Sequence, residues 1–146
     1  MINDEMVVEY LTQAGFWKNE NLYFLGQFAK PFWKKIIGLF FFGAIAGLSE
    51  GSLVIVNKNG DGIAVLPVKM ANFEAKLMPV LKSSYFIANA DIIEIKITKN
   101  SAQNRIDFVT NTKGKFSIAV EGSNPHIARH EQNFSKFLAL YPVKEM

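Results

Sequence analysis

The segment ADIIEIKITKNSAQNRIDFVTNTKGKFSIAVEG, Ala90–Gly122, alternates apolar and polar residues in three runs. A period of two places one set of side chains on a buried face and the other in solvent, which indicates half-buried strands. The connections NSAQN and TKGK are short enough to join neighbouring antiparallel strands. The segment therefore predicts a three-stranded meander. Its predicted inward residues are Ile93, Ile95, Ile97, Ile106, Phe108, Phe116, Ile118 and Val120.

A helix is predicted directly after this meander. Ser123 or Asn124 can cap it and Pro125 lies near its first turn, while Glu131 through Tyr141 completes it. Its apolar residues recur at helical spacing, which predicts one buried face. The residues of that face are Ile127, Phe134, Phe137, Leu138 and Tyr141.

Strands are also predicted before the meander. NLYFLGQFA, residues 21–29, is rich in aromatic residues. SLVIVNKNGDGIAVLPV, residues 52–68, contains two β-branched runs joined by turn residues, which predicts a hairpin. We expect Gly60 and Gly62 to supply positive φ angles in its turn. Residues 70–82 are ambiguous, because Pro79 limits a helix there.

The chain opens with a predicted short helix. Asn3 can cap it, and Gly15 can end it. Met6, Val7, Tyr10, Leu11 and Ala14 fall on one side of such a helix, so we expect that side to pack on the rest of the chain.

This order of elements resembles the bacterial pleckstrin-homology-like domains, relatives of the GRAM domain, over roughly residues 20–141. The resemblance implies a mainly β (α+β) fold. It implies a bent antiparallel barrel closed at one end by a C-terminal helix, to which this chain adds a short N-terminal helix. The predicted organisation is an N-terminal helix, 1–16, packed on a single domain of this type, 17–146.

The resemblance also implies binding of a protein, a peptide or a phosphoinositide headgroup, without catalysis. Lipid-binding members carry a basic cluster between their first two strands. The matching stretch here is QFAKPFWKKI, in which Lys30, Lys34 and Lys35 lie beside Phe32 and Trp33. These five residues are the candidate ligand- or membrane-binding residues. The cluster lacks the Arg that completes the family pattern, and Lys offers a point charge where Arg offers a planar fork.

Ile36–Leu48 contains thirteen consecutive residues without a polar side chain. A membrane span needs about 20, so this run is too short to cross a bilayer. It is predicted to be core with an edge that a second chain, the first helix or lipid covers. The candidate interface residues are Phe40, Phe41, Phe42 and Ile45.

Composition restricts the function classes. The 146 residues include no Cys, which removes disulfides and thiolate chemistry. Only Arg105 and Arg129 are arginines, which argues against specific nucleic-acid recognition. The start MINDEMVVEY lacks the basic residues and the continuous apolar core of a signal peptide, so we expect a cytoplasmic protein or one that is peripheral at the inner membrane face.

The net charge of +3 is divided unevenly along the chain. Residues 1–20 hold four acids and one base, whereas residues 21–146 hold nine acids and fifteen bases. An acidic leader beside a basic body is consistent with self-association or with an acidic partner. Scattered, screened lysines give the same totals.

Catalytic motifs are weak in this sequence. NKNGDG, residues 57–62, copies half of a calcium loop, but Val68 stands where the loop needs a bidentate Glu. His126 and His130 are spaced as metal ligands can be, but the third ligand would have to be Glu131 or a distant residue, so solvated histidines on a helix surface are expected. We therefore expect no enzyme activity, cofactor, metal or small-molecule substrate.

Two function hypotheses follow from these observations. The first is an interaction module that binds a protein partner or self-associates. The second is a peripheral membrane module that meets anionic lipid through its Lys and aromatic tip.

Overall fold

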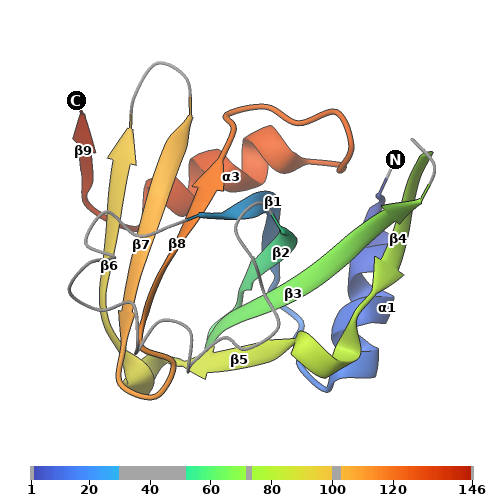
Figure 1. The fold of residues 1–146 in the computed structure, drawn as a ribbon, viewed down its shortest axis with the longest axis horizontal. Coiled ribbons are helices and arrows are strands. Elements are labelled where there is room, and N and C mark those ends of the chain that lie inside the picture. Colours follow the sequence, from blue (N-terminus) through green and yellow to red (C-terminus); the bar gives the residue numbers. More distant parts are fainter. Residues whose placement is uncertain (1, 30–51, 72–73, 100–102, 146) are drawn as a thin grey trace.

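A computed structural model describes residues 2–29, 52–71, 74–99 and 103–145. The described chain is mainly β, with a helix near each end and one sheet between them (Figure 1). The elements are α1 (Asp4–Ala14), β1 (Leu22–Ala29), β2 (Leu53–Lys58), β3 (Gly62–Ala71), β4 (Glu74–Pro79), η1 (Leu81–Ser83), β5 (Tyr85–Ala88), η2 (Asn89–Asp91), β6 (Ile92–Lys99), β7 (Asn104–Thr110), β8 (Lys115–Val120), α3 (His130–Leu138) and β9 (Val143–Glu145).

The strands form one sheet in the order β4-β3-β2-β1-β8-β7-β6-β9, and β5 adds to β3 beside β4. All neighbouring pairs are antiparallel except β9, which runs parallel to β6. The predicted meander is confirmed as β6-β7-β8, and the predicted hairpin as β2-β3. The mainly β (α+β) class is confirmed too. The barrel is not closed, because β4 and β9 at the two ends of the order do not pair within the described residues.

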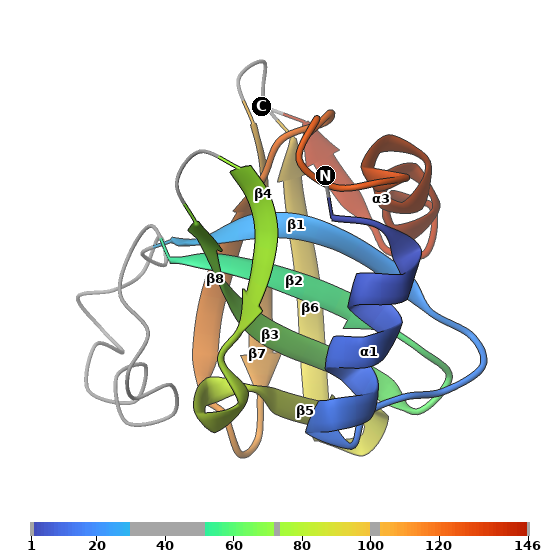
Figure 2. The ribbon, with the colours of Figure 1, turned by 90° about the vertical axis from the view of Figure 1, so that its right-hand side faces the viewer.

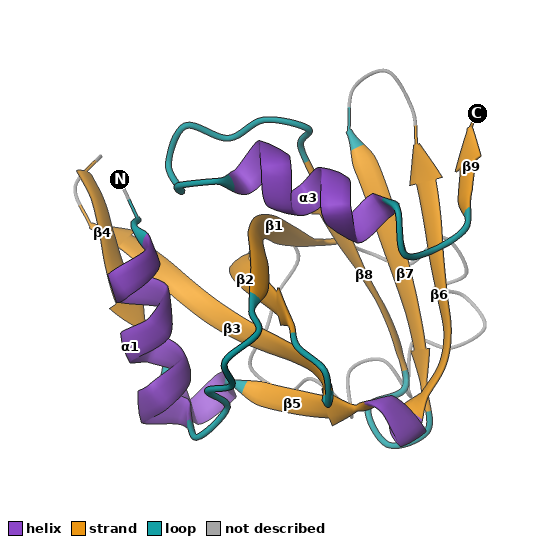
Figure 3. Cartoon of the chain, turned by 180° about the vertical axis from the view of Figure 1, so that it is seen from behind, coloured by secondary structure: helices purple, strands orange, loops and turns teal. Residues whose placement is uncertain are grey.

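The inner face of the bent sheet holds the larger apolar cluster. Its members come from β1, β2, β3 and the meander, together with α3, which lies against the sheet in Figure 3. Phe134 and Phe137 of α3 place their rings 5.0 and 4.9 Å from the ring of Phe24 on β1. Both side chains are buried, as the helical spacing predicts. The C-terminal helix therefore closes the inner face.

A second cluster lies on the opposite face of β1, β2 and β3, where α1 crosses them (Figure 2). Val7, Tyr10 and Leu11 of α1 are buried there, which confirms the predicted helix face. The ends of α1 are also as predicted: the Asn3 side chain accepts a hydrogen bond from the N–H of Met6, and Gly15 has a φ of 80°. The N-terminal helix is thus packed on the sheet.

The last helix begins later than its capping signals predict. Asn124 accepts a hydrogen bond from the N–H of His126 in a local turn, but no helix begins there. Ile127 instead forms a parallel bridge with Ile2 and packs in the α1 cluster. The helix starts at His130, after Arg129 at a φ of 61°. Pairing with the N-terminus therefore outweighs the local helix signal.

A β-bulge alters the predicted face of β6. The register with β7 shifts between Ile92 and Glu94, which makes Ile93 the extra residue. As a result, Ile93 is 61% exposed, and Ile92 packs against the inner cluster in its place. Ile95 and Ile97 are buried as expected.

The hairpin turn uses its glycines differently from the prediction. Neither Gly60 nor Gly62 has a positive φ. A Cβ built on Gly62 would lie 2.1 Å from the carbonyl oxygen of Ile87 on β5. This glycine is needed because β5 approaches its Cα closely, and not for its conformational freedom.

Candidate functional site

The candidate residues chosen from the sequence lie outside the described part of the chain. They are Lys30, Phe32, Trp33, Lys34, Lys35, Phe40, Phe41, Phe42 and Ile45. The described residues on either side of them are neighbours in the sheet: Gln27 of β1 pairs with Leu53 of β2, and the N–H of Phe28 donates to the carbonyl of Ser52 at 2.8 Å. The chain therefore leaves and rejoins the sheet at one place.

The C-terminal edge of the sheet is a second candidate surface, which sequence reasoning missed. β9 follows α3 after a short turn and pairs with β6, placing Val143 opposite Ile97 and Lys144 opposite Thr98. Among the described strands, β9 pairs with β6 alone, so its other edge carries backbone N–H and C=O groups without a strand partner. Such an edge can accept a further strand.

Exposed apolar side chains accompany this edge. Leu140, in the turn between α3 and β9, is 56% exposed, and Val143 on β9 is 38% exposed. Tyr141 and Pro142 separate them, and the N–H of Leu140 donates to the carbonyl of Phe137 at 3.0 Å, which fixes the turn. An apolar turn beside an unpaired strand edge is a suitable contact for another polypeptide.

Basic residues cover the outer face of the same strands. Thr98 of β6 has Lys144 of β9 as its neighbour on one side and Arg105 of β7 on the other. Lys96 lies two residues from Thr98, so it projects from the same face. Lys96 and Lys144 are exposed, and Arg105 is half-buried. We call Lys96 and Lys144 the basic pair.

Asp107 lies next to Lys96 in the register but is not free to pair with it in solvent. Asp107 is buried and accepts a short hydrogen bond from the Ser117 hydroxyl. Nε of Arg105 lies 3.3 Å from the same carboxylate oxygen. Burial and the hydrogen bond from Ser117 therefore hold the Asp107 carboxylate within the β7-β8 face.

His126 and His130 do not share a helix face. His126 is exposed and precedes α3, whereas His130 is its first residue and is buried. Nδ1 of His130 accepts a hydrogen bond from the N–H of Leu25 at 3.1 Å, so its proton resides on Nε2, which donates to the carbonyl of Glu121 at 2.6 Å. Burial lowers the pKa of His130, and the nearby Glu121 and Glu131 oppose that shift. The expectation of two solvated histidines is wrong for His130.

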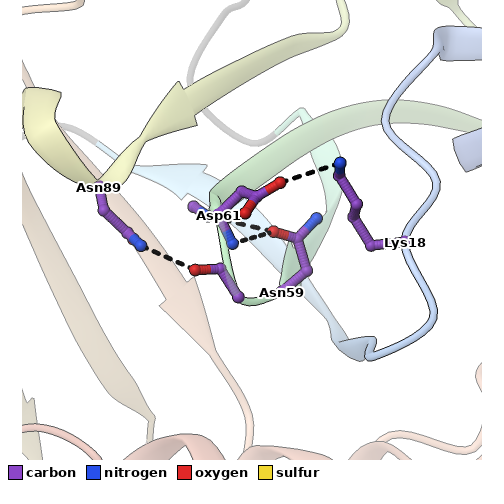
Figure 4. Close-up of polar contacts among 6 residues, drawn as sticks. Lys18, Asn59, Asp61 and Asn89 are labelled. Carbon is purple, nitrogen blue, oxygen red and sulfur yellow. Dashed lines mark hydrogen bonds and ion pairs between the residues drawn. The ribbon is translucent and has the colours of Figure 1, made fainter.

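The calcium-like stretch forms a structural turn (Figure 4). Oδ1 of Asn59 accepts the N–H groups of Asp61 at 2.8 Å and of the next residue at 3.1 Å. The Asp61 carboxylate lies 3.0 Å from Nζ of Lys18, and Nδ2 of Asn89 donates to the carbonyl of Gly60 at 2.9 Å. The turn is thus held by the loop after α1 and by η2, as the sequence interpretation of a hairpin turn expects.

Buried tyrosines also have structural roles. The Tyr10 hydroxyl donates to the carbonyl of Pro67 at 2.5 Å and accepts the N–H of Val80 at 3.0 Å. Tyr23 donates a short hydrogen bond to Asp4, which also pairs with Arg129 at 3.1 Å. Burial raises the pKa of both tyrosines, so both remain protonated at neutral pH. These contacts join α1 to β1, β3 and the segment before α3.

Metal-binding clusters and membrane-spanning helices are both absent from the described residues. No group of three or more His, Cys, Asp or Glu side chains is arranged to hold a metal ion there. In the same part of the chain, none of the helices combines the length and the apolar character needed to cross a bilayer.

Comparisons with known proteins do not identify a family. No protein family matches the chain, and no curated protein matches it. Among solved structures, the chain is similar to the hSac2 domain from the human phosphoinositide phosphatase Sac2, with a TM-score of 0.46 and 9% sequence identity. The alignment covers 98% of this chain and 90% of that chain. A similarity at this level carries no inference about function.

Proposed function

We propose that this chain is a non-enzymatic interaction module, of the pleckstrin-homology-like type that its sequence resembles, which binds a protein partner or a second copy of itself. The observation that carries the proposal is the C-terminal edge of the sheet. There the chain adds its own strand β9 to β6, and within the described residues it leaves the outer edge of β9 unpaired beside Leu140 and Val143.

Two physical properties of this edge favour a polypeptide partner. A partner strand can take up the backbone groups of β9, which supplies affinity that does not depend on side-chain sequence. Leu140 and Val143 then offer apolar area next to that strand, which supplies selectivity. An exposed edge with apolar neighbours is otherwise an aggregation risk, so natural proteins usually cover it.

The state of the polar groups supports the non-enzymatic part of the proposal. Both ring nitrogens of His130 form hydrogen bonds with backbone groups. The Asp107 carboxylate accepts a hydrogen bond from Ser117 and forms an ion pair with Arg105. A general acid or base must exchange protons with a substrate, and a side chain fixed in this way is poorly placed to do so.

The membrane module remains the second candidate, and a specific sequence feature favours it. Lys30, Lys34 and Lys35 with Phe32 and Trp33 combine cations and interfacial aromatic residues, which suit an anionic lipid surface. Flotation with vesicles that contain phosphatidylserine separates the two candidates. A membrane module should float with the vesicles, whereas a protein-binding module should stay in solution.

The proposed function is tested by comparing the wild type with Leu140→Ser combined with Val143→Ser. Ile93→Ser is the matched control, because it removes an exposed apolar residue from the opposite end of β6. The immobilised wild type first captures candidate partner proteins. Each captured protein, and the wild type itself, is then purified and titrated against the wild type, the edge variant and the control. The edge variant should bind about tenfold or more weakly, while the control should bind as the wild type does. Equal binding by all three proteins would exclude this edge as the contact.

A further inference from the structure

Two pairs of exposed residues with opposite charge lie on elements at the two ends of the described structure. α1 lies at one end of the longest axis, and β6 with β9 lies at the other (Figure 1). Glu5 and Glu9 are exposed on α1, four residues apart and therefore one above the other on the helix. Lys96 and Lys144, the basic pair, are exposed at the far end.

Neighbouring ions do not neutralise these four residues. At the acidic end, Asp4 pairs with Arg129, but Glu9 contacts only the neutral amide of Gln13, at 3.3 Å. Within the described residues, neither Glu5 nor Glu9 forms an ion pair. At the basic end, the described chain likewise places no acid in an ion pair with Lys96 or Lys144, and the nearby Asp107 is engaged by Arg105.

The spacings of the two pairs differ by only a few ångströms. Side chains four residues apart on a helix have Cβ atoms about 5–6 Å apart. Lys144 lies directly across from Thr98, and Lys96 is two residues farther along, so the basic pair is a diagonal strand pair about 7–8 Å apart. Lysine side chains are long enough to absorb the difference, so each Lys can reach one Glu of a facing helix.

We propose that copies of this chain associate head to tail, with Glu5 and Glu9 of one copy against Lys96 and Lys144 of the next. The inference rests on the self-associating form of the proposed function and names its partner as a second copy. Because the two surfaces lie at opposite ends, one copy can use both at once. Each contact joins two different surfaces, so the assembly grows with increasing concentration as an open chain, or as a ring if the rotation between copies closes.

Charge pairs in solvent are individually weak, so this association is sensitive to salt. Leu140 and Val143 lie on the same edge as Lys144 and add apolar area to the contact. The expected behaviour is a weak, concentration-dependent assembly at low ionic strength that dissociates when salt is added.

A charge exchange between the two surfaces tests the proposal. One variant combines Lys96→Glu with Lys144→Glu, and the other combines Glu5→Lys with Glu9→Lys. Each variant alone presents like charges at every contact, so its dissociation constant in sedimentation velocity should be at least about tenfold above that of the wild type. A mixture of the two variants restores opposite charges at every contact, so it should assemble again. Melting curves check that both variants fold.

A matched control reverses two exposed lysines outside both surfaces, Lys69→Glu with Lys136→Glu. This control changes net charge by the same amount as the first variant, so it should assemble as the wild type does. If the wild type assembles but the mixture of exchanged variants does not, the head-to-tail contact is wrong and self-association itself stands. If the wild type is a monomer at low salt and high concentration, the inference is overturned, and the capture experiment alone then decides the proposed function.

Discussion

The backbone N–H of Leu25 donates a hydrogen bond to Nδ1 of His130 at 3.1 Å, although 105 positions separate the two residues. The other ring nitrogen donates to the carbonyl of Glu121. A neutral imidazole is required for this arrangement, because protonation would place a second N–H where the Leu25 N–H already points. His130 therefore joins β1 to the end of β8 and to α3 only while it is neutral.

Stability should depend on pH through His130. Burial lowers its pKa in the folded state below the ordinary value of 6.5, and Glu121 and Glu131 only partly offset this. Between the lowered pKa and 6.5, the unfolded chain binds more protons than the folded one, so the free energy of unfolding rises with pH and reaches its full value above that window. Urea denaturation at pH values from about 5 to 7.5 measures this slope.

Substitution isolates the contribution of His130 from that of the carboxylates. His130→Gln should lower the free energy of unfolding at pH 7.5 by about 1–3 kcal/mol, because a buried backbone group loses its partner. It should also flatten the pH slope. His126→Gln, at an exposed position, should leave both unchanged. A slope that persists in His130→Gln would assign the pH dependence to other groups.

A second prediction concerns the close approach of β5 to the hairpin turn. Gly62→Ala would place a Cβ 2.1 Å from the carbonyl oxygen of Ile87, so the strands must move apart. The free energy of unfolding should fall by about 1–3 kcal/mol, as for other overpacked sites. Gly60→Ala is the control, since no atom lies within 4 Å of its Cβ position. Thermal melting of both variants measures the difference, and similar losses in the two would contradict the packing explanation.

A third prediction concerns the Tyr10 hydroxyl. Tyr10→Phe keeps the buried ring but leaves the carbonyl of Pro67 and the N–H of Val80 without this partner. The expected loss is about 1–3 kcal/mol in urea denaturation. Tyr141→Phe removes a half-buried hydroxyl that forms no hydrogen bond in the described structure, so it should cost much less. Equal costs would mean that the Tyr10 hydrogen bonds contribute little.

Sequence patterns predicted the elements whose signals are local. Asn3 and Gly15 bound α1 as expected, and the alternation in β7 and β8 identified the residues of the inner face correctly. The other face was expected in solvent, but Asp107 and Ser117 are buried there too. Where the prediction failed, a residue distant in sequence decides the structure. Ile127 pairs with Ile2, and Gly62 packs against Ile87. No local pattern contains that information.

The candidate site shows the same limit. The burial of His130 depends on Leu25 and Glu121, which the spacing of two histidines cannot reveal. The basic pair was hidden because Lys144 follows Lys96 by 48 positions and becomes its neighbour only when β9 pairs with β6. A parallel three-residue strand after a helix has no sequence signature of its own. The aromatic and lysine residues of the β1–β2 connection stay a prediction from sequence.

The final prediction concerns the N-terminal helix as part of the folded domain. Deleting residues 1–16 removes the side chains of Val7, Tyr10 and Leu11, each of which buries apolar area worth about 1.5–3 kcal/mol. Their sum is comparable with the total stability of a domain, about 5–15 kcal/mol. The deletion also uncovers apolar residues on the outer face of β1–β3. Those residues are Tyr23, Leu25, Ile55 and Leu66.

The shortened protein should bind a hydrophobic dye strongly and aggregate, because a large apolar face is then open to water. The full chain with Glu5→Lys and Glu9→Lys is the control, since both residues lie on the exposed side of α1 and the variant should fold normally. Dye fluorescence and light scattering compare the two proteins. A shortened protein that stays monomeric, binds little dye and unfolds sharply would show that the sheet and α3 fold without α1, and that the helix is an attachment to a domain complete in itself.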